Sequence, residues 1–199
     1  MEDIKTSDSD PSIDANIIPA GLQSDLSDTC INESNKIKHL PYQLPTILLT
    51  NLQSFGKPGK TDKTTELELV LELNCIDIGV FTETWATDAA LKSLDFEDYN
   101  MFHSVRNNCS RASGGLSIFV KNTIPAKKLD INIPDHLEVM YVSIRPNRLP
   151  RSVSNIILCA LYYPGSTSIY APPHEDLILH VNETIQFFYS KFSNPLIVY

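Results

Sequence analysis

Short apolar runs separated by polar turns dominate the chain from its second quarter onward. Two of them, residues 46–50 and 78–81, have the length and composition of buried strands. The pattern between them has helical spacing, and Thr61 or Asp62 offers an N-cap, so a helix is expected to run to about Leu73. Its predicted buried face consists of Leu67, Val70, Leu71 and Asn74. This order of elements predicts a crossover between two neighbouring strands.

The middle of the chain carries apolar runs in succession, without a helical pattern between them. They span residues 99–105, 116–120, 131–133, 138–144 and 154–162. Strands that follow one another in this way, with turn residues between them, predict an antiparallel arrangement.

The last part of the chain predicts a second helix and a further strand. After Pro172 and Pro173, apolar residues recur at spacings of three or four, which is typical of an amphipathic helix. Its predicted buried face consists of Leu177, Val181, Ile185, Phe188 and Phe192. A buried strand is expected from residue 196. The patterns together predict an α/β domain over residues 45–199, with a mixed, largely antiparallel sheet and flanking helices.

The first 44 residues differ from the rest in composition. They are rich in Ser, Asp and Asn and show no sustained period, which predicts a disordered acidic tail. The formal net charge is −8, of which −5 falls on residues 1–40. The predicted domain is therefore nearly balanced, and its charge neither indicates nor excludes a polyanionic partner.

Cysteine spacing and hydropathy bear on the cellular location of the protein. Cys75 and Cys159 lie in or beside apolar runs and are expected to be buried thiols, and no zinc-type spacing occurs. This pattern favours a reducing, intracellular location, the nucleus included. No run approaches the roughly 18 to 20 apolar residues of a membrane span, so no membrane partner is expected.

Polar residues close two of the predicted strands. Asn51 follows the first strand, and Glu83 follows the second, between two threonines and the only tryptophan. Ligands of α/β proteins collect beyond the carboxyl ends of such strands, so both residues are candidates for a site. The alternatives are a solvated turn glutamate and an asparagine that satisfies local backbone groups.

Four motifs in order resemble those of the endonuclease/exonuclease/phosphatase superfamily. They are the strand-end Asn51, T-E-T-W around Glu83, G-G-L-S-I-F-V-K from Gly114 and L-Y-Y-P-G around Tyr162. The residues of these motifs are most similar to those of the endonuclease domains of retrotransposons without long terminal repeats. The resemblance covers about residues 45–199 and implies the N-terminal half of a four-layered α/β sandwich.

The resemblance implies hydrolysis of a phosphodiester, with DNA as the partner and Mg²⁺ or Mn²⁺ as the cofactor. Glu83 resembles the glutamate that binds the divalent ion. Asn51 and Tyr162 resemble residues that contact the phosphate near the cleavage site. Arg111 and Lys121 flank the strand after the two glycines, where they are candidates for contacts to nucleic acid or, alternatively, solvated loop charges.

Two further motifs of the superfamily do not occur in the sequence. These are G-D-F-N, which carries the water-activating Asp, and S-D-H, which carries the catalytic His. The chain is therefore expected to be a C-terminally truncated nuclease domain, inactive by itself. The alternatives are a non-catalytic pseudo-nuclease that binds nucleic acid or protein, and a phosphoesterase that acts on small phosphorylated molecules.

Overall fold

The computed structural model of the protein describes residues 44–55, 63–87, 90–91, 94, 96–106, 113–165, 168 and 171–199. The predicted tail apart from Leu44, the predicted N-cap at Thr61 or Asp62, and Arg111 lie outside these ranges. The elements are β1 (Ile47–Asn51), α2 (Lys63–Leu73), β2 (Ile78–Thr82), β3 (Tyr99–Ser104), β4 (Leu116–Lys121), β5 (Ala126–Lys128), β6 (Glu138–Ile144), β7 (Ile156–Tyr162), α4 (His174–Lys191) and β8 (Leu196–Val198).

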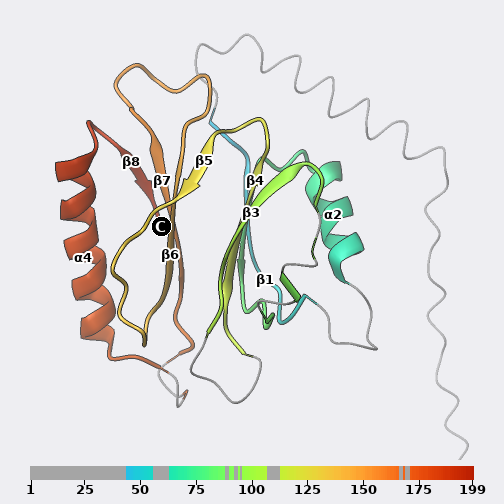
Figure 1. The fold of residues 1–199 in the computed structure, drawn as a ribbon, viewed down its shortest axis with the longest axis horizontal. Coiled ribbons are helices and arrows are strands. Elements are labelled where there is room, and N and C mark those ends of the chain that lie inside the picture. Colours follow the sequence, from blue (N-terminus) through green and yellow to red (C-terminus); the bar gives the residue numbers. More distant parts are fainter. Residues whose placement is uncertain are drawn as a thin grey trace, which may run out of the picture.

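The strands form two sheets that face each other. The first sheet has the order β1-β2-β4-β3 and the second has the order β5-β6-β7-β8. Strands β1 and β2 pair in parallel across α2, β7 and β8 pair in parallel across α4, and all other pairs are antiparallel. Figure 1 shows α2 on the outer side of the first sheet and α4 on the outer side of the second. The predicted mixed, largely antiparallel α/β architecture is confirmed.

Side-chain alternation along the strands divides the apolar residues among three cores. In β2, Ile78 and Val80 face the second sheet, whereas Phe81 points outward under α2. In β6, Met140 faces the first sheet and Tyr141 points outward under α4. The central strands β2, β4, β6 and β7 are therefore buried on both faces, which explains why they read as nearly continuous apolar runs.

One predicted strand is wrong and another was missed. Residues 131–133 form no strand, and β5 lies a few residues earlier, where it pairs with β6. Ile131 and Ile133 still pack against the core under α4. The alternation of these residues therefore indicates that two side chains are buried. An extended loop can bury them in this way without pairing to a neighbouring strand.

The buried faces of both helices differ from the predicted ones. In α2, Leu67 and Leu71 are buried, but Val70 and Asn74 are exposed. The side-chain amide of Asn74 donates a hydrogen bond to the Val70 carbonyl at 2.8 Å. Asn74 therefore caps the end of the helix and does not contribute to the core.

In α4, the buried residues are His180, Thr184 and Phe188, whereas the predicted Val181 and Ile185 are only half-buried. Of the five predicted residues, Phe188 is buried, and Leu177 and Phe192 pack against the core under α4. Apolar periodicity therefore found the helix and part of its buried face, but not the two polar residues that share it.

The two cysteines that were expected to be thiols differ. Cys159 is a buried free thiol, and burial raises its pKa to about 12. Cys75 takes part in a disulfide, so the prediction of a thiol there is wrong. Its side chain is only half-buried just after α2, because apolar neighbours in sequence do not enclose it. Neither described helix has the length and apolar content that a membrane crossing requires.

One end of the sandwich exposes apolar side chains that face inward. Strand β2 packs over β7. The edge strands β1 and β8, which neighbour β2 and β7, therefore lie on the same side of the sandwich. Ile47 and Leu49 pair with core residues of β2 and share their inward face, yet 41% and 70% of their surfaces are exposed. Leu196 on β8 is 39% exposed. The core between the sheets is therefore open at the β1/β8 end.

Candidate active site

The carboxyl ends of β1 and β2 bring Asn51 and Glu83 to one rim of the first sheet. In the parallel ladder, Asn51 lies opposite Thr82, and Glu83 follows directly. Two residues earlier, Leu49 pairs with Val80, whose side chain lies in the core between the sheets. Because strand side chains alternate, Asn51 points toward the second sheet, as Val80 does.

The Glu83 carboxylate points toward the second sheet too. Its backbone is left-handed, with φ of 52°, which interrupts the strand alternation after Thr82. Glu83 Oε1 accepts a hydrogen bond from the hydroxyl of Tyr162, at the end of β7. Burial and the neighbouring Glu83 carboxylate raise the pKa of Tyr162 to about 12, so its hydroxyl remains a donor at neutral pH. This contact joins the two sheets at the rim.

Tyr163, the neighbour of Tyr162, has a different environment. Its hydroxyl donates to the Pro172 carbonyl at 3.3 Å, and its ring stacks on His174 with centroids 4.3 Å apart. Of the two adjacent tyrosines, the one that was predicted for the site is therefore the one that contacts Glu83.

The backbone around Glu83 is held from both sides. The Ser54 amide, in the loop after β1, donates to the Glu83 carbonyl at 2.8 Å. On the other side, the Trp85 amide donates to the Gly114 carbonyl at 3.0 Å. The left-handed turn at Glu83 is thus fixed by backbone hydrogen bonds, which position its side chain in advance of any ligand.

The two glycines before β4 are required by this packing. Gly114 and Gly115 have φ of 68° and 86°. A Cβ atom on Gly115 would lie 2.6 Å from Thr84 Oγ1, and one on Gly114 would lie 2.5 Å from Glu138 Oε2. The G-G motif is therefore explained by close approach and by left-handed backbone conformation.

Sequence reasoning missed Glu138 as a member of the site and did not commit to Arg106. Glu138 opens β6 opposite Tyr162, and its Oε2 accepts from the Gly115 amide at 2.7 Å. It also forms an ion pair with Arg106, and the two side chains are only 13% and 12% exposed. A usable signal was the charged residue at the start of an otherwise apolar strand. Because it is paired and hydrogen-bonded, it tolerates burial.

Asn51 has a local role in addition to its place at the rim. Its Oδ1 accepts from the Gln53 amide at 3.1 Å, which caps the turn after β1. The local alternative for Asn51 is therefore observed. A phosphate contact from this residue would come from its amide nitrogen.

Lys121 lies at the opposite end of the sheet. Its Nζ is 3.5 Å from Asp77 Oδ1, and Asp77 precedes β2 whereas Glu83 follows it. The five residues of β2 lie between them, so the Cα atoms of Asp77 and Glu83 are ~20 Å apart at the usual rise per residue. Lys121 therefore does not join Asn51, Glu83 and Tyr162, and Arg111 lies outside the described residues.

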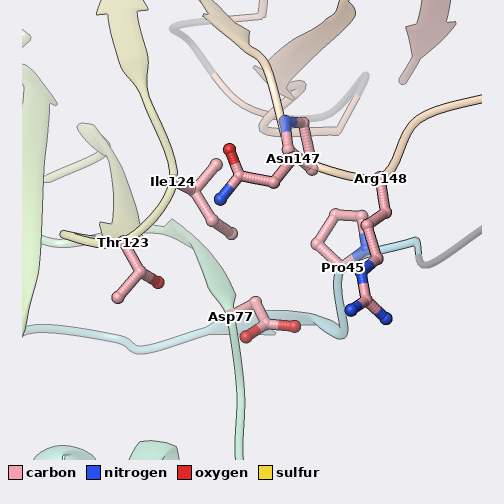
Figure 2. A pocket seen from close by; sticks show the side chains of 7 residues that line it. Pro45, Asp77, Thr123, Ile124, Asn147 and Arg148 are labelled. Atoms are coloured by element: carbon pink, nitrogen blue, oxygen red, sulfur yellow. The ribbon is translucent and has the colours of Figure 1, made fainter. Parts of the chain in front are cut away.

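This opposite end has a cavity of its own, of about 310 Å³. Figure 2 shows its residues converging from several separate segments of the chain. The lining residues are Pro45, Asp77, Thr123, Ile124, Pro146, Asn147 and Arg148. The Asp77 carboxylate is already engaged there, since Oδ2 accepts from the Thr46 amide at 2.9 Å.

A divalent ion would find one suitable carboxylate at the rim. In the part of the chain that the structure describes, no group of three or more His, Cys, Asp or Glu side chains could hold a metal. Glu138 is engaged with Arg106 and Gly115. Mg²⁺ often relies on one or two carboxylates plus water and substrate phosphates, so Glu83 fits as one ligand of an otherwise open shell.

At the level of sequence, no protein-family model and no curated protein matches this chain. Its structure is similar to that of TDP2 from C. elegans, with 11% identity, a TM-score of 0.54 and coverage of 98% of this chain and 70% of that one. A humanized D. rerio TDP2 is 12% identical, with a TM-score of 0.47, over 72% of this chain and 55% of that one.

An endonuclease/exonuclease/phosphatase from Beutenbergia cavernae DSM 12333 is 12% identical, with a TM-score of 0.49, over 71% of this chain and 43% of that one. The chain thus spans about half the length of two of these three proteins and 70% of the C. elegans one. The likeness to C. elegans TDP2 shows that this chain shares the fold of that protein over the aligned part.

Proposed function

We propose that this chain is part of a divalent-metal-dependent phosphodiesterase that cleaves DNA, of the retroelement endonuclease type. The observation that supports this most is the Glu83–Tyr162 hydrogen bond. It places a carboxylate from one sheet and a hydroxyl from the other at the rim where Asn51 closes β1. DNA as the substrate would give the active protein a nuclear location.

Each residue at the rim has a role in this proposal. Glu83 would hold Mg²⁺ or Mn²⁺, which supplies charge neutralisation of the phosphate oxygens when bound. Tyr162 fixes the orientation of Glu83 through its hydroxyl, and the Asn51 amide nitrogen is available to a phosphate oxygen. Arg106, held by Glu138, lies near enough to Tyr162 to act on its hydroxyl, and its charge offsets part of the carboxylate charge at this rim.

Lys121 and Arg111 keep their proposed contacts to nucleic acid. For Lys121, the position beside Asp77 means that such a contact would lie beyond the far end of β2 from Glu83. DNA bound there would therefore contribute to affinity and would not take part in cleavage.

We further propose that the active protein covers the open β1/β8 end of the sandwich with additional strands. Ile47, Leu49 and Leu196 face that opening and are more exposed than core residues should be. One metal-binding carboxylate, without the G-D-F-N and S-D-H residues, is too little for hydrolysis. We therefore expect the present chain to bind metal weakly and not to cleave DNA by itself.

Two other functions remain alternatives. A non-catalytic pseudo-nuclease would bind nucleic acid with a salt-dependent affinity but would show no metal requirement. A phosphoesterase for small phosphorylated molecules would bind such a compound at the same rim and would ignore DNA. Binding of a DNA duplex and of a nucleoside monophosphate, each with and without Mn²⁺, separates the three functions.

The test uses supercoiled plasmid and Mn²⁺ titration calorimetry. The chain should leave the plasmid intact, bind Mn²⁺, and lose that binding in Glu83→Gln. The control is Glu72→Gln, on the exposed side of α2, which should bind Mn²⁺ as the parent does. Equal Mn²⁺ binding by the Glu83→Gln variant would contradict the proposed metal ligand. Metal-dependent nicking that Glu83→Gln abolishes would overturn only the expected inactivity.

A further inference from the structure

Cys75 occupies a backbone position at which glycine is usually favoured. It lies just after α2, and its φ is 49°. The Cys75 amide donates to the Glu72 carbonyl at 2.9 Å. The Ile76 amide donates to the Leu71 carbonyl, also at 2.9 Å, and the two bonds form the Schellman pattern that ends a helix. Any side chain at this left-handed position costs free energy relative to glycine, and the disulfide gives the side chain of Cys75 a role that offsets this cost.

The chain offers few partners for this disulfide. Its four cysteines are Cys30, Cys75, Cys109 and Cys159. Cys159 is a free thiol in the core under α4. The partner of Cys75 is therefore Cys30, Cys109 or a cysteine of another molecule.

The chain approaches Cys109 at the end of the first sheet that is opposite to Cys75. β3 ends at Ser104, and the ladders through β4 place Ser104 at the level of Thr82 in β2. Arg106, the last described residue before Cys109, follows two residues later. Cys75 precedes β2, at the other end of the sheet.

The separation of these ends is too great for a bond between Cys75 and Cys109. The length of β2 separates the ends by ~20 Å at the usual rise per residue. The three residues from Arg106 to Cys109 span at most ~11 Å. The Cα atoms of a disulfide lie within about 7 Å of each other. The two lengths together fall short of the separation, so Cys109 is excluded as the partner.

Cys30 is within reach of Cys75 from the point where the N-terminal segment joins the first sheet. The Thr46 amide donates to Asp77 Oδ2 at 2.9 Å, and the Ile78 amide donates to the Thr46 carbonyl at 3.0 Å. Thr46 therefore lies beside a residue that follows Cys75 by only two positions. Thr46 is 16 residues after Cys30, and a chain of that length reaches ~50 Å when extended. The segment is thus much longer than the distance it has to cover.

We propose that Cys75 is bonded to Cys30 of the same chain, and that this disulfide is a redox-sensitive cross-link that holds β1 in place. The bond closes a loop that contains both β1 and α2. Among the described strands, β1 is an edge strand with β2 as its neighbour, and 41% of Ile47 and 70% of Leu49 are exposed. A cross-link restricts the unfolded chain and so favours the folded state of the loop that it closes.

The bond forms and breaks by thiol–disulfide exchange. Formation removes two electrons and two protons from the two thiols, and a low-molecular-weight disulfide takes them up as it is cleaved to two thiols. A dithiol reductant reverses the step. Cys75 is half-buried and within reach of such reagents, whereas the thiol of Cys159 is buried and takes no part in the exchange. The cross-link does not depend on the proposed phosphodiesterase function.

Peptide mapping identifies the partner of Cys75. The full chain is oxidised with glutathione disulfide, its thiols are alkylated, and it is digested without reduction. One cross-linked pair of peptides should contain Cys30 and Cys75, from a protein that is monomeric on non-reducing gels. Cys109→Ala should keep this pair, and Cys30→Ala should leave Cys75 open to alkylation. A bond from Cys75 to Cys109, a bond between two copies, or alkylation of Cys75 in the oxidised parent would overturn the proposal.

Thermal unfolding and hydrogen exchange test the effect on β1. The oxidised parent should melt about 10 °C above the parent reduced with dithiothreitol, as expected for a loop of this length. Reduction should accelerate amide exchange in β1 much more than in β6. A melting temperature that reduction leaves unchanged, or equal acceleration in both strands, would contradict the cross-link.

Cys75→Gly separates the bond from the backbone conformation. This variant should melt above the reduced parent, because glycine suits the left-handed position, and below the oxidised parent, because it lacks the bond. Cys109→Ala is the matched control and should respond to reduction as the parent does. A Cys75→Gly variant that melts at or above the oxidised parent would show that the disulfide does not stabilise the fold.

Discussion

The two ends of β2 carry one carboxylate each, and they are built differently. Asp77 precedes the strand and is held by the Thr46 amide and by Lys121, with both ion-pair side chains partly exposed. Glu83 follows the strand in a left-handed backbone conformation and receives its hydrogen bond from the opposite sheet. The contacts of Asp77 stabilise the start of β2, and the hydrogen bond to Glu83 fixes its carboxylate between the two sheets.

The difference teaches where this fold concentrates its constraints. At the Glu83 end, Arg106, Glu138 and the two glycines interlock at close distance, and a change in one disturbs the others. At the Asp77 end, the side-chain contacts are partly exposed to solvent. Substitutions at the Glu83 end should therefore cost far more stability than equivalent ones at the Asp77 end.

The largest effect is expected for Glu138→Ala. It removes the ion pair with the buried Arg106 and the acceptor of the Gly115 amide, so the free energy of unfolding should fall by about 3 kcal/mol. Asp77→Ala, at the other end, should cost about 1 kcal/mol. Urea unfolding measures both. Equal losses would remove the contrast between the two ends.

The second effect concerns the close approach at Gly115. Gly115→Ala combines a left-handed backbone with a clash against Thr84, so a loss of about 2 to 3 kcal/mol is expected. Gly165→Ala is the matched control, since its φ is 82° and, among the described residues other than its chain neighbours, no atom lies within 4 Å of the added Cβ. It should lose only about 1 kcal/mol. A control that is as destabilised as Gly115→Ala would show that backbone strain alone is responsible.

Tyr162→Phe should have an intermediate effect of about 1 kcal/mol, because it removes one hydrogen bond to a half-exposed carboxylate. The pH dependence gives a sharper test. Tyr162 has its pKa raised from 10.0 to about 12, so its contribution is complete below pH 10 and is lost as the pH rises toward 12. The parent should therefore lose more stability than the variant in that window. Parallel pH profiles would show that the hydroxyl does not titrate beside Glu83.

The smallest effect is expected for Lys121→Ala. Its ion pair with Asp77 is partly exposed, so the free energy of unfolding should change by less than about 1 kcal/mol and less again in high salt. A loss above about 2 kcal/mol, measured by urea unfolding, would mean that the Asp77 end is as tightly built as the Glu83 end.

The sequence predicted those parts of the fold that depend on local patterns. Strand β2 and the run at β6 were found because burial on both faces leaves nearly continuous apolar residues. The rim at Asn51 and Glu83 followed from the parallel crossover, since the carboxyl ends of neighbouring parallel strands meet. Tyr162 joined them through the motif resemblance rather than through any periodicity.

The features that were missed depend on contacts between distant residues. Glu138 is 32 residues from Arg106, and nothing in either local sequence indicates that the two are buried together. Part of the buried face of α4 was missed because His180 and Thr184, which are polar, occupy positions that a stability argument assigns to apolar residues. Both misses involve buried polar groups, which sequence patterns treat as exposed.

The location of bound Mn²⁺ tests the central contrast most directly. In backbone amide spectra, substoichiometric Mn²⁺ should broaden the signals of Asn51, Thr82 and Thr84 and leave those of Asp77 and Lys121 sharp. Glu83→Gln should abolish the broadening. Broadening centred on Asp77, or broadening at the Glu83 rim that survives Glu83→Gln, would contradict the assignment of Glu83 as the metal ligand.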